Sequence, residues 1–379
     1  MIDYILRGQR TMRNSSRILI IGPSPERGYF GGVATHIRNL VNLSALQGAI
    51  VFDPGSFNTD RPRSPFSITG ALFSLRRMVR EGRYDVVMLN VSIYTFSILK
   101  LALMLLLIPK RGVREIHVFF HGGRVEHLPL VSWSPVRAIL LPIMNKATML
   151  HFLSRVQKEG FESMFRGCAT GVFSNYAATD ALPSKSDQAT VRPLRLLFVG
   201  RILEQKGMFE LLEAIEKLQM DYPGRIVLTI VGNGRDLARA RRRAESLPPG
   251  VVEFLGYLEG PALETAYLES DILILPSYSE AFPYVVIEAM RAGLPTIATP
   301  VGALETVICD GVTGLHVRPR DVSQLVGAIT TFLNNPSLLS TMSLNCRNYF
   351  REHLSKSAAE KYYSQLVQRS AKGKYETES

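Results

Sequence analysis

The sequence has few cysteines, and their spacing excludes two common uses of that residue. Cys168, Cys309 and Cys346 are odd in number, lie far apart, and form neither a CxxC pair nor another metal-ligand spacing. We therefore expect free thiols in a reducing compartment. Low-complexity tracts are also missing, and a chain with 46% hydrophobic and 20% charged residues has the composition of a folded protein rather than a disordered one.

A secretory signal is missing from the first residues. Residues 1–16 carry Arg7, Arg10 and Arg13 but no continuous apolar stretch, so they predict a flexible basic N-terminus rather than a cleaved leader. We accordingly expect the protein to act in the cytoplasm.

An uninterrupted membrane-spanning run is missing as well. The most apolar stretch, residues 91–109, approaches the ~20 residues that a spanning helix needs, but Ser92, Ser97 and Lys100 interrupt it. It also lies between two expected strands of one domain. A buried or half-buried helix is therefore favoured, a helix lying in the membrane interface stays open, and a true span is disfavoured.

Acidic residues are scarce in the first half of the chain. Residues 1–190 contain 23 Lys and Arg against 12 Asp and Glu, whereas residues 191–379 contain 21 of each, so the net charge of +11 lies entirely in the first half. Such a basic half indicates an anionic partner, and anionic lipid head groups, a phosphorylated acceptor and nucleic acid all qualify, alongside plain solubility. Nucleic acid is disfavoured because no aromatic and basic binding motif accompanies the charge.

Short apolar runs that end in glycine or proline alternate with helix-length segments. This pattern is typical of buried parallel strands, and it restarts at Leu194 after a polar, proline-bounded linker at 180–193. It predicts two doubly wound parallel sheets in tandem, and a chain of 379 residues suits two domains with a cleft between them. The expected strands are 17–22, 50–52, 86–90, 116–121, 149–154, 194–200, 226–232, 251–255, 271–276 and 295–298.

Glycines and cations gather after the first strand of the second half. Gly200-Arg201 and Lys206-Gly207 bound a loop that leads into an expected helix at 208–220. Glycines permit close backbone approach, a helix start offers free N–H groups, and the two cations add positive charge, which together suit a diphosphate. On its own the pattern is equally compatible with an ordinary strand-to-helix turn.

Further glycines follow the next two strands, at Gly232-Asn233 and Gly256-Tyr257. They are either turns or positions where the backbone approaches a nucleotide without a side chain in the way.

Two glutamates follow the strand at 271–276. Glu280 lies in a loop or at a helix start, and Glu288 lies eight positions later in the expected helix 285–292. Their carboxylates are able to accept hydrogen bonds from sugar and ribose hydroxyls, with a helix start between them. Two glutamates at this spacing are common, so the spacing alone decides little.

Taken in order, these elements resemble one family. The series Gly-Arg-x4-Lys-Gly, a Gly-x-Gly strand end, Pro-Ser-x2-Glu-x7-Glu-Ala-Met-x-Ala-Gly-x-Pro and Asp310 to Leu315 resembles the retaining GT-B glycosyltransferases of the group 1 or family 4 type, closely over residues 195–320. The resemblance implies two Rossmann-like α/β domains facing a central cleft. They are an acceptor-binding domain at 17–185 and a nucleotide-sugar-binding domain at 186–350, followed at 351–379 by a helix that packs back toward the first domain and a polar tail.

The resemblance also implies catalytic roles. Arg201 and Lys206 match the basic pair that binds the donor diphosphate and stabilises charge on the leaving group. Glu280 matches a glutamate placed against the donor sugar, and Glu288 one that holds the ribose. His121, which ends an expected strand, resembles a histidine that faces the sugar in many members, although a strand-end histidine is also often structural.

The wider donor site follows from the same match. His36 and His127 are weaker candidates than His121. The chain departs from the family pattern at two places: Phe282-Pro283 replaces the common Phe-Gly, and Val301-Gly302-Ala303 replaces the frequent Val-Gly-Gly. These departures leave the identity of the transferred sugar undetermined, but they do not argue against the activity. The implied donor-binding residues are Gly31, Gly32, Gly200, Arg201, Lys206, Gly232, Asn233, Tyr257, Phe282, Pro283 and Glu288.

The implied activity is transfer of a hexose-type sugar, with retention of configuration, from a nucleoside diphosphate sugar to an acceptor hydroxyl in bacterial polysaccharide or glycolipid biosynthesis. No metal or other cofactor is expected. The expected acceptor is a glycan or a lipid-linked molecule, and the inner face of the cytoplasmic membrane is a candidate anionic partner. A nucleotide-sugar epimerase of GT-B fold and a non-catalytic glycosyltransferase-like subunit are the alternatives. The sequence leaves the donor base, the sugar and the acceptor undetermined.

Overall fold

The computed structural model describes residues 17–24, 32–54, 65–82, 84–109, 112–122, 133–179, 182 and 192–372. The expectations for residues 1–16, Gly31, His127 and most of the linker at 180–193 lie outside these ranges. The chain divides into two compact units, which are described separately: unit 1 comprises residues 1–178 and 356–379, and unit 2 comprises residues 179–355.

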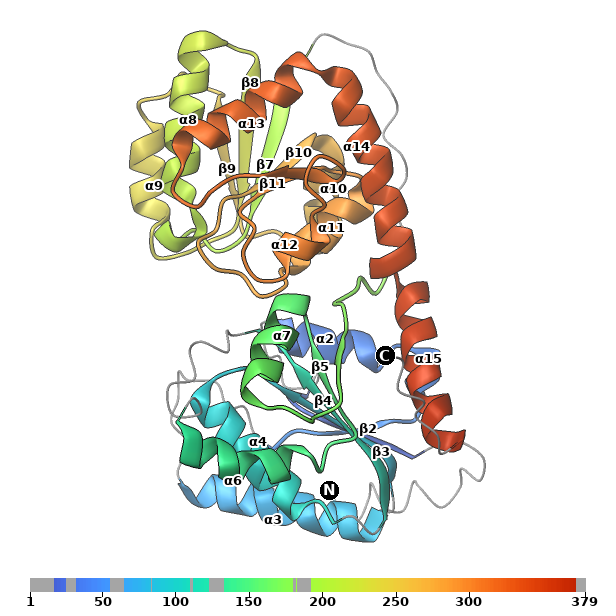
Figure 1. Cartoon of the computed structure of the whole chain (residues 1–379). Helices are drawn as coiled ribbons and strands as arrows, with labels where there is room; N and C mark the ends of the chain where they lie inside the picture. Colours follow the sequence, from blue (N-terminus) through green and yellow to red (C-terminus); the bar gives the residue numbers. More distant parts are fainter. Residues whose placement is uncertain are drawn as a thin grey trace. The chain divides into compact units, whose positions relative to one another are not determined.

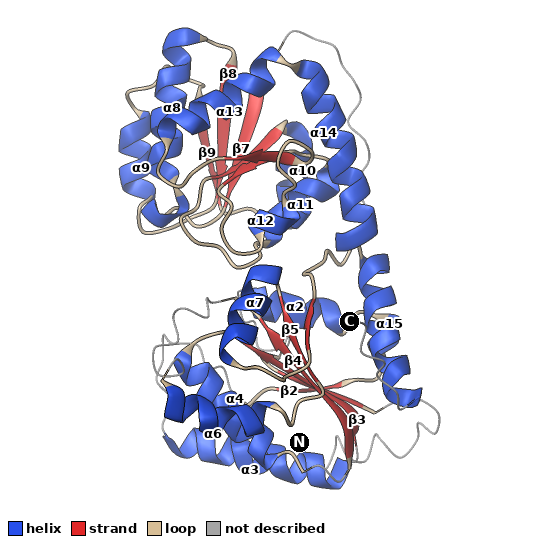
Figure 2. Ribbon diagram, in the orientation of Figure 1, coloured by secondary structure: helices blue, strands red, loops and turns tan. Residues whose placement is uncertain are grey.

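Unit 1 contains a parallel six-stranded sheet in the order β2-β1-β3-β4-β5-β6 (Figures 1 and 2). Its strands are β1 (Ile18–Ile21), β2 (Ile50–Phe52), β3 (Tyr84–Val91), β4 (Val113–Phe120), β5 (Met149–Phe152) and β6 (Thr170–Val172). Its helices are α2 (Gly32–Leu40), η3 (Ser44–Leu46), α3 (Pro65–Gly82), α4 (Thr95–Leu107), α6 (Ser134–Met144), α7 (Arg155–Met164) and α15 (Lys356–Lys372).

The main apolar core of unit 1 lies on one face of this sheet. Leu75 of α3, Leu101 and Leu105 of α4, Leu140 of α6 and Phe161 of α7 are buried together with the sheet residues of that face. Residues 91–109 therefore form the end of β3, helix α4 and a short connection, and α4 contributes one side to the core. No helix within the described part of the chain is long and apolar enough to cross a membrane.

The opposite face of the sheet bears histidine and aromatic side chains instead. The rings of Phe119 and His151 stack with centroids 4.4 Å apart, and Tyr363 of α15 lies 5.9 Å from Phe119. His36 of α2 packs in the same layer, 6.5 Å from the Tyr363 ring. Helices α2 and α15 thus contribute side chains to this face, although α15 comes from the far end of the sequence (Figure 1).

A buried hydrogen-bonded chain also joins α15 to the sheet. Glu115 contacts the Nε2 atom of His117 at 3.0 Å, and the Nδ1 atom of His117 contacts His151 at 3.0 Å. The other ring nitrogen of His151 lies 2.7 Å from the hydroxyl of Tyr362. These contacts satisfy polar groups that burial would otherwise penalise, so they fix the position of α15 on the sheet.

Unit 2 contains a second parallel six-stranded sheet, in the order β12-β11-β10-β7-β8-β9. Its strands are β7 (Leu194–Val199), β8 (Ile226–Val231), β9 (Val252–Gly256), β10 (Ile272–Leu275), β11 (Thr296–Ala298) and β12 (Gly314–His316). Its helices are η5 (Glu204–Lys206), α8 (Met208–Asp221), α9 (Leu237–Ala244), α10 (Gly260–Glu269), α11 (Tyr284–Ala292), α12 (Leu304–Val307), α13 (Val322–Asn334), α14 (Pro336–Tyr349) and η6 (Phe350–Leu354). The two sheets confirm the predicted doubly wound α/β architecture.

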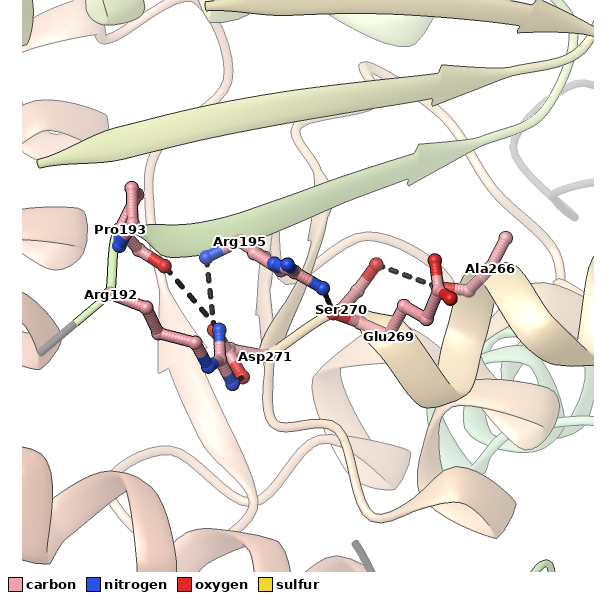
Figure 3. Close-up of polar contacts among 7 residues, drawn as sticks. All are labelled: Arg192, Pro193, Arg195, Ala266, Glu269, Ser270 and Asp271. Atoms are coloured by element: carbon pink, nitrogen blue, oxygen red, sulfur yellow. Dashed lines mark hydrogen bonds and ion pairs between the residues drawn. The ribbon is translucent and has the colours of Figure 1, made fainter. Parts of the chain in front are cut away.

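The amino ends of β7 and β10 are joined by an acidic anchor (Figure 3). The carboxylate of Asp271 accepts hydrogen bonds from both terminal nitrogens of Arg192, at 2.8 and 2.7 Å, and from the backbone N–H of Arg195, at 2.9 Å. Asp271 is only 9% exposed, so this two-point pair holds the two central strands in register. The anchor lies at the edge of the sheet opposite to the loops that follow the strands, where ligands of such sheets bind.

Candidate functional site

Most of the predicted donor residues of unit 2 lie in the loops after β7, β8 and β10. A Cβ atom on Gly207, whose φ is +72°, would lie 2.2 Å from the carbonyl oxygen of Pro276, and one on Gly232 would lie 1.9 Å from that of Gly200. Both positions therefore require glycine, because any side chain would collide with backbone. The three loops consequently pack closely at the carboxyl edge of the sheet.

Lys206 and Glu280 form an ion pair across two of these loops. The ammonium of Lys206 donates to the Oε1 atom of Glu280, and the hydroxyl of Ser277 donates to the same oxygen at 2.8 Å. The lysine and glutamate side chains are 16% and 10% exposed. Among the described residues no donor contacts the second carboxylate oxygen, Oε2, so Glu280 is held in place with one oxygen available to a ligand hydroxyl.

Arg201 lies in the same loop as Lys206 and is exposed. Its guanidinium makes no hydrogen bond or ion pair with the described residues. A side chain with five N–H donors and a permanent charge is suited to two oxygens of a phosphate group. The loop thus presents one cation fixed against a carboxylate and one cation that no described residue pairs with.

Glu288 has a different environment from Glu280. It lies in the second turn of α11, and its Oε2 atom accepts the hydroxyl of Tyr267 at 2.8 Å. Burial raises the pKa of Glu288, and the Tyr267 hydrogen bond opposes that shift. The sequence predicted these two glutamates as one motif, whereas the structure gives them separate protein partners.

The loop before α11 is supported by the loop after β11. A Cβ atom on Gly302, whose φ is +63°, would lie 2.0 Å from the carbonyl oxygen of Glu280, and the N–H of Ala303 donates to Ala281 at 2.8 Å. The chain therefore keeps glycine at the one position of its Val-Gly-Ala segment where close approach demands it. Phe282 is buried and Pro283 caps the start of α11.

Asn233 and Tyr257 follow β8 and β9 as predicted, but their side chains contact neighbours in their own loops. The Asn233 amide oxygen accepts the N–H of Gly234 at 2.7 Å, and the Tyr257 hydroxyl donates to Glu259 at 3.1 Å. Tyr257 is 66% exposed. Its ring is thus available to stack on a planar ligand.

In unit 1, His121 lies directly after β4 and contacts Asn90 at the end of β3. Its Nε2 atom is 2.8 Å from the amide oxygen of Asn90. Because that oxygen only accepts, Nε2 carries the ring proton and Nδ1 keeps its lone pair. No described residue forms a hydrogen bond with Nδ1, although the side chain is only 7% exposed. Within the described part of the chain, His121 is thus a buried acceptor without a hydrogen-bond donor.

His36 reinforces the neutral state of His121. The two rings lie 4.5 Å apart, and burial together with His36 lowers the pKa of His121 well below its ordinary value. Burial also lowers the pKa of His36 to about 3. Two neutral imidazoles therefore lie at the carboxyl edge of the unit 1 sheet, and His121 suits hydrogen-bond acceptance rather than proton donation.

Gly32, the described member of the predicted glycine pair, is the first residue of α2, the helix that carries His36. The sequence had not singled out Asn90 or Ser277. Both are polar residues at strand ends, which is the signal that would have identified them.

Comparison with known proteins identifies the second half of the chain. The family model described as Glycosyl transferases group 1 matches residues 184–352. Glycogen synthase of Mycobacterium tuberculosis is 33% identical over 151 residues, which cover 38% of this chain and 35% of that protein. D-inositol 3-phosphate glycosyltransferase of Geodermatophilus obscurus is 36% identical over 155 residues, which cover 38% of this chain and 34% of that protein. The matched region spans about a third of the length of these relatives.

Solved structures are similar over nearly the whole chain. Sucrose-phosphate synthase of Thermosynechococcus elongatus aligns with a TM-score of 0.72 at 20% identity, covering 95% of this chain and all of the other. Anabaena Alr3699/HepE in complex with UDP-glucose aligns with a TM-score of 0.69 at 16% identity, covering 94% of this chain and all of the other. At these identities the likeness shows the fold. Residues 184–352 therefore belong to the group 1 glycosyl transferases, within a chain whose two units have the GT-B fold.

Proposed function

We propose that this protein is a retaining glycosyltransferase that moves a hexose-type sugar from a nucleoside diphosphate sugar to an acceptor hydroxyl. The observation that supports this most strongly is the contact of Lys206 and Ser277 with Glu280 within the segment that matches the family. Arg201 lies in the same loop as Lys206 and has no partner among the described residues. Two positive charges and an oriented carboxylate in these loops support binding of a diphosphate that carries a sugar.

The leaving diphosphate is the main target of catalysis in this proposal. As the bond to the sugar breaks, negative charge grows on the phosphate oxygens. Arg201 and Lys206 stabilise this charge, and the pairing with Glu280 holds Lys206 in position for it. The close-packed glycines at Gly207 and Gly232 leave backbone rather than side chains beside the phosphates. This chemistry requires no further group from the protein.

Glu280 orients the sugar rather than attacking it. Its Oε1 atom is already occupied by a cation and a hydroxyl, which lowers its nucleophilicity, while Oε2 stays available to accept a sugar hydroxyl. We therefore favour a front-face reaction in which the departing phosphate takes the acceptor proton. Glu288 accepts a ribose hydroxyl, and His121 of unit 1 offers a neutral imidazole that is able to accept a hydroxyl of a substrate.

The acceptor is a glycan or a lipid-linked molecule of bacterial polysaccharide or glycolipid biosynthesis at the cytoplasmic side of the membrane. The basic charge of the first half of the chain supports an anionic acceptor or surface.

A panel of nucleoside diphosphate sugars, beginning with uridine diphosphate sugars because the HepE structure holds UDP-glucose, tests the donor. A true donor raises the unfolding temperature progressively as its concentration exceeds its dissociation constant. Release of nucleoside diphosphate that depends on added acceptor supports transfer. Interconversion of the donor without acceptor would instead indicate an epimerase, and binding without either reaction would indicate a non-catalytic subunit.

A further inference from the structure

Helix α4 is apolar on its exposed side as well as on its buried side. Phe96, Leu99, Leu103 and Leu106 are 81%, 38%, 49% and 53% exposed, and their spacing of three and four residues places them in one stripe. An amphipathic helix that packs on a sheet normally presents polar residues to water at these positions. Contact between the exposed stripe of α4 and water is therefore unfavourable in free energy, and the packing of unit 1 does not explain why the stripe is apolar.

Helix α6 extends this surface. It packs beside α4, and the ammonium of Lys146, just after α6, donates to the Leu105 carbonyl at the end of α4 at 2.5 Å. Ile139 is 66% exposed and lies on the same side of α6 as the exposed residues Pro135 and Pro142. Trp133, at the start of the helix, is 64% exposed. We call the stripe of α4 with Trp133 and Ile139 the α4–α6 face.

The charged residues of the helices around this face are positive except Glu81 of α3, which pairs with Arg77. Neither α4 nor α6 contains Asp or Glu, whereas Lys100 lies in α4 and Arg137 in α6. Helix α3 packs on α4 and presents Arg76 and Arg80 to solvent. An apolar surface with a basic border is complementary to a partner whose outer layer is negatively charged and whose layer below is apolar.

We propose that the α4–α6 face docks unit 1 on an anionic lipid bilayer, with the apolar stripe entering the interface and the arginines meeting lipid phosphates. Helices that lie in the interface bury their apolar side at the boundary between head groups and acyl chains, and binding increases with apolar area and with anionic lipid content. Tryptophan is enriched at that depth because its ring is amphipathic. The proposal concerns unit 1 alone and does not depend on the donor chemistry of unit 2.

A second copy of the chain fits this face less well. A two-fold interface brings the same patch of both subunits together, so the basic borders would face each other and repel. A bilayer with anionic head groups attracts the same residues instead.

Flotation with vesicles tests the proposal on the full chain, without donor or acceptor. Vesicles of phosphatidylcholine alone are compared with vesicles that contain an equal part of phosphatidylglycerol. Trp133 is the chain's single tryptophan, so its emission reports directly on the face. We expect binding to the anionic vesicles only, with a shift of the emission to shorter wavelength.

Variants separate the two contributions. Phe96→Gln with Leu103→Gln should weaken binding at least ~10-fold because two large apolar side chains no longer enter the interface. Arg76→Gln with Arg80→Gln should weaken it and reduce its dependence on salt. The matched control is Met220→Gln with Leu344→Gln, which removes two side chains that are 72% and 58% exposed on unit 2, and it should bind like the unchanged protein.

Three results would overturn the proposal: no binding of the unchanged protein to anionic vesicles, equal binding of the α4 variant and the control, or a dimer that the α4 variant dissociates. Because the α4 and α3 variants lie outside unit 2, they should keep the thermal shift given by a donor. That measurement distinguishes failure of membrane docking from failure of the proposed function.

Discussion

Replacing Lys206 by alanine removes the cation that fixes Glu280 and that the proposed mechanism places against the leaving diphosphate. In the unliganded protein, the change leaves the Glu280 carboxylate, 10% exposed, with the Ser277 hydroxyl as its remaining described donor. Loss of one partner from a largely buried hydrogen-bonded group costs about 1–3 kcal/mol of stability. The variant should therefore remain folded, with a lower unfolding temperature.

The effect on catalysis should be larger than the effect on stability. A preorganised group that stabilises developing charge contributes roughly 3–4 kcal/mol to the transition state, so kcat should fall on the order of a hundredfold or more. The assay is the initial rate of nucleoside diphosphate release with donor and acceptor, measured over a range of donor concentrations. A matched control is Lys217→Ala on α8, because Lys217 pairs with Glu213 at 2.8 Å but both side chains are about half exposed, at 46% and 45%. The control should change neither rate nor stability appreciably.

A double-mutant cycle with Glu280→Gln separates two roles for Lys206. If the lysine acts mainly by orienting Glu280, the double variant should lose much less than the two single losses combined. If it acts directly on the phosphate, the losses should combine fully. A Lys206→Ala protein that transfers sugar at the unchanged rate would refute the assignment of this residue to catalysis.

The remaining predictions concern the histidines of unit 1. Asn90→Leu removes the acceptor for the Nε2 proton of His121. The NMR shifts of the ring nitrogens should therefore change from those of one fixed tautomer to those of a mixture, and the rate of sugar transfer should fall. Unchanged ring-nitrogen shifts would contradict the positioning role of Asn90. Burial lowers the pKa values of His36, His121 and His151, so below pH ~6.5 the unfolded chain binds protons that the folded chain does not. The free energy of unfolding of unit 1 should thus fall as the pH drops below ~6.5, by up to ~1.4 kcal/mol per pH unit for each histidine, with no contribution from these groups above it. Denaturant titrations at neutral and acidic pH measure this slope, and His36→Phe, which keeps a ring in an aromatic layer, should reduce it; an equal slope in that variant would exclude His36 as a contributor.

The fold was predictable because strands such as β1 and β10 are buried on both faces. Such strands appear in the sequence as short apolar runs, and Ile272–Leu275 lies within the run expected at 271–276. The order of glycines, cations and glutamates after these runs then predicted which loops meet, since the carboxyl ends of parallel strands lie at one edge of the sheet.

The contacts within the site were less predictable because they join distant residues. Lys206 and Glu280 are 74 positions apart, His121 and Asn90 are 31 apart, and Tyr362 and His151 are 211 apart. Only the folded chain shows which strand ends become neighbours. The exposure of the α4 stripe was hidden for another reason: a helix that is apolar on all sides has no periodicity to distinguish its buried side from its exposed side.

The central claim is that the loop containing Arg201 and Lys206 binds the diphosphate of the donor, and calorimetric titration tests it most directly. The unchanged protein is titrated with the nucleoside diphosphate that the donor panel selects and with the corresponding nucleoside, and the Arg201→Ala, Lys206→Ala double variant is treated in the same way. Hydrogen bonds to charged groups contribute about 1.5–3 kcal/mol each, so the unchanged protein should bind the diphosphate at least ~100-fold more tightly than the nucleoside. The account predicts that the double variant loses most of this preference, and a preference of the same size in the double variant would contradict it.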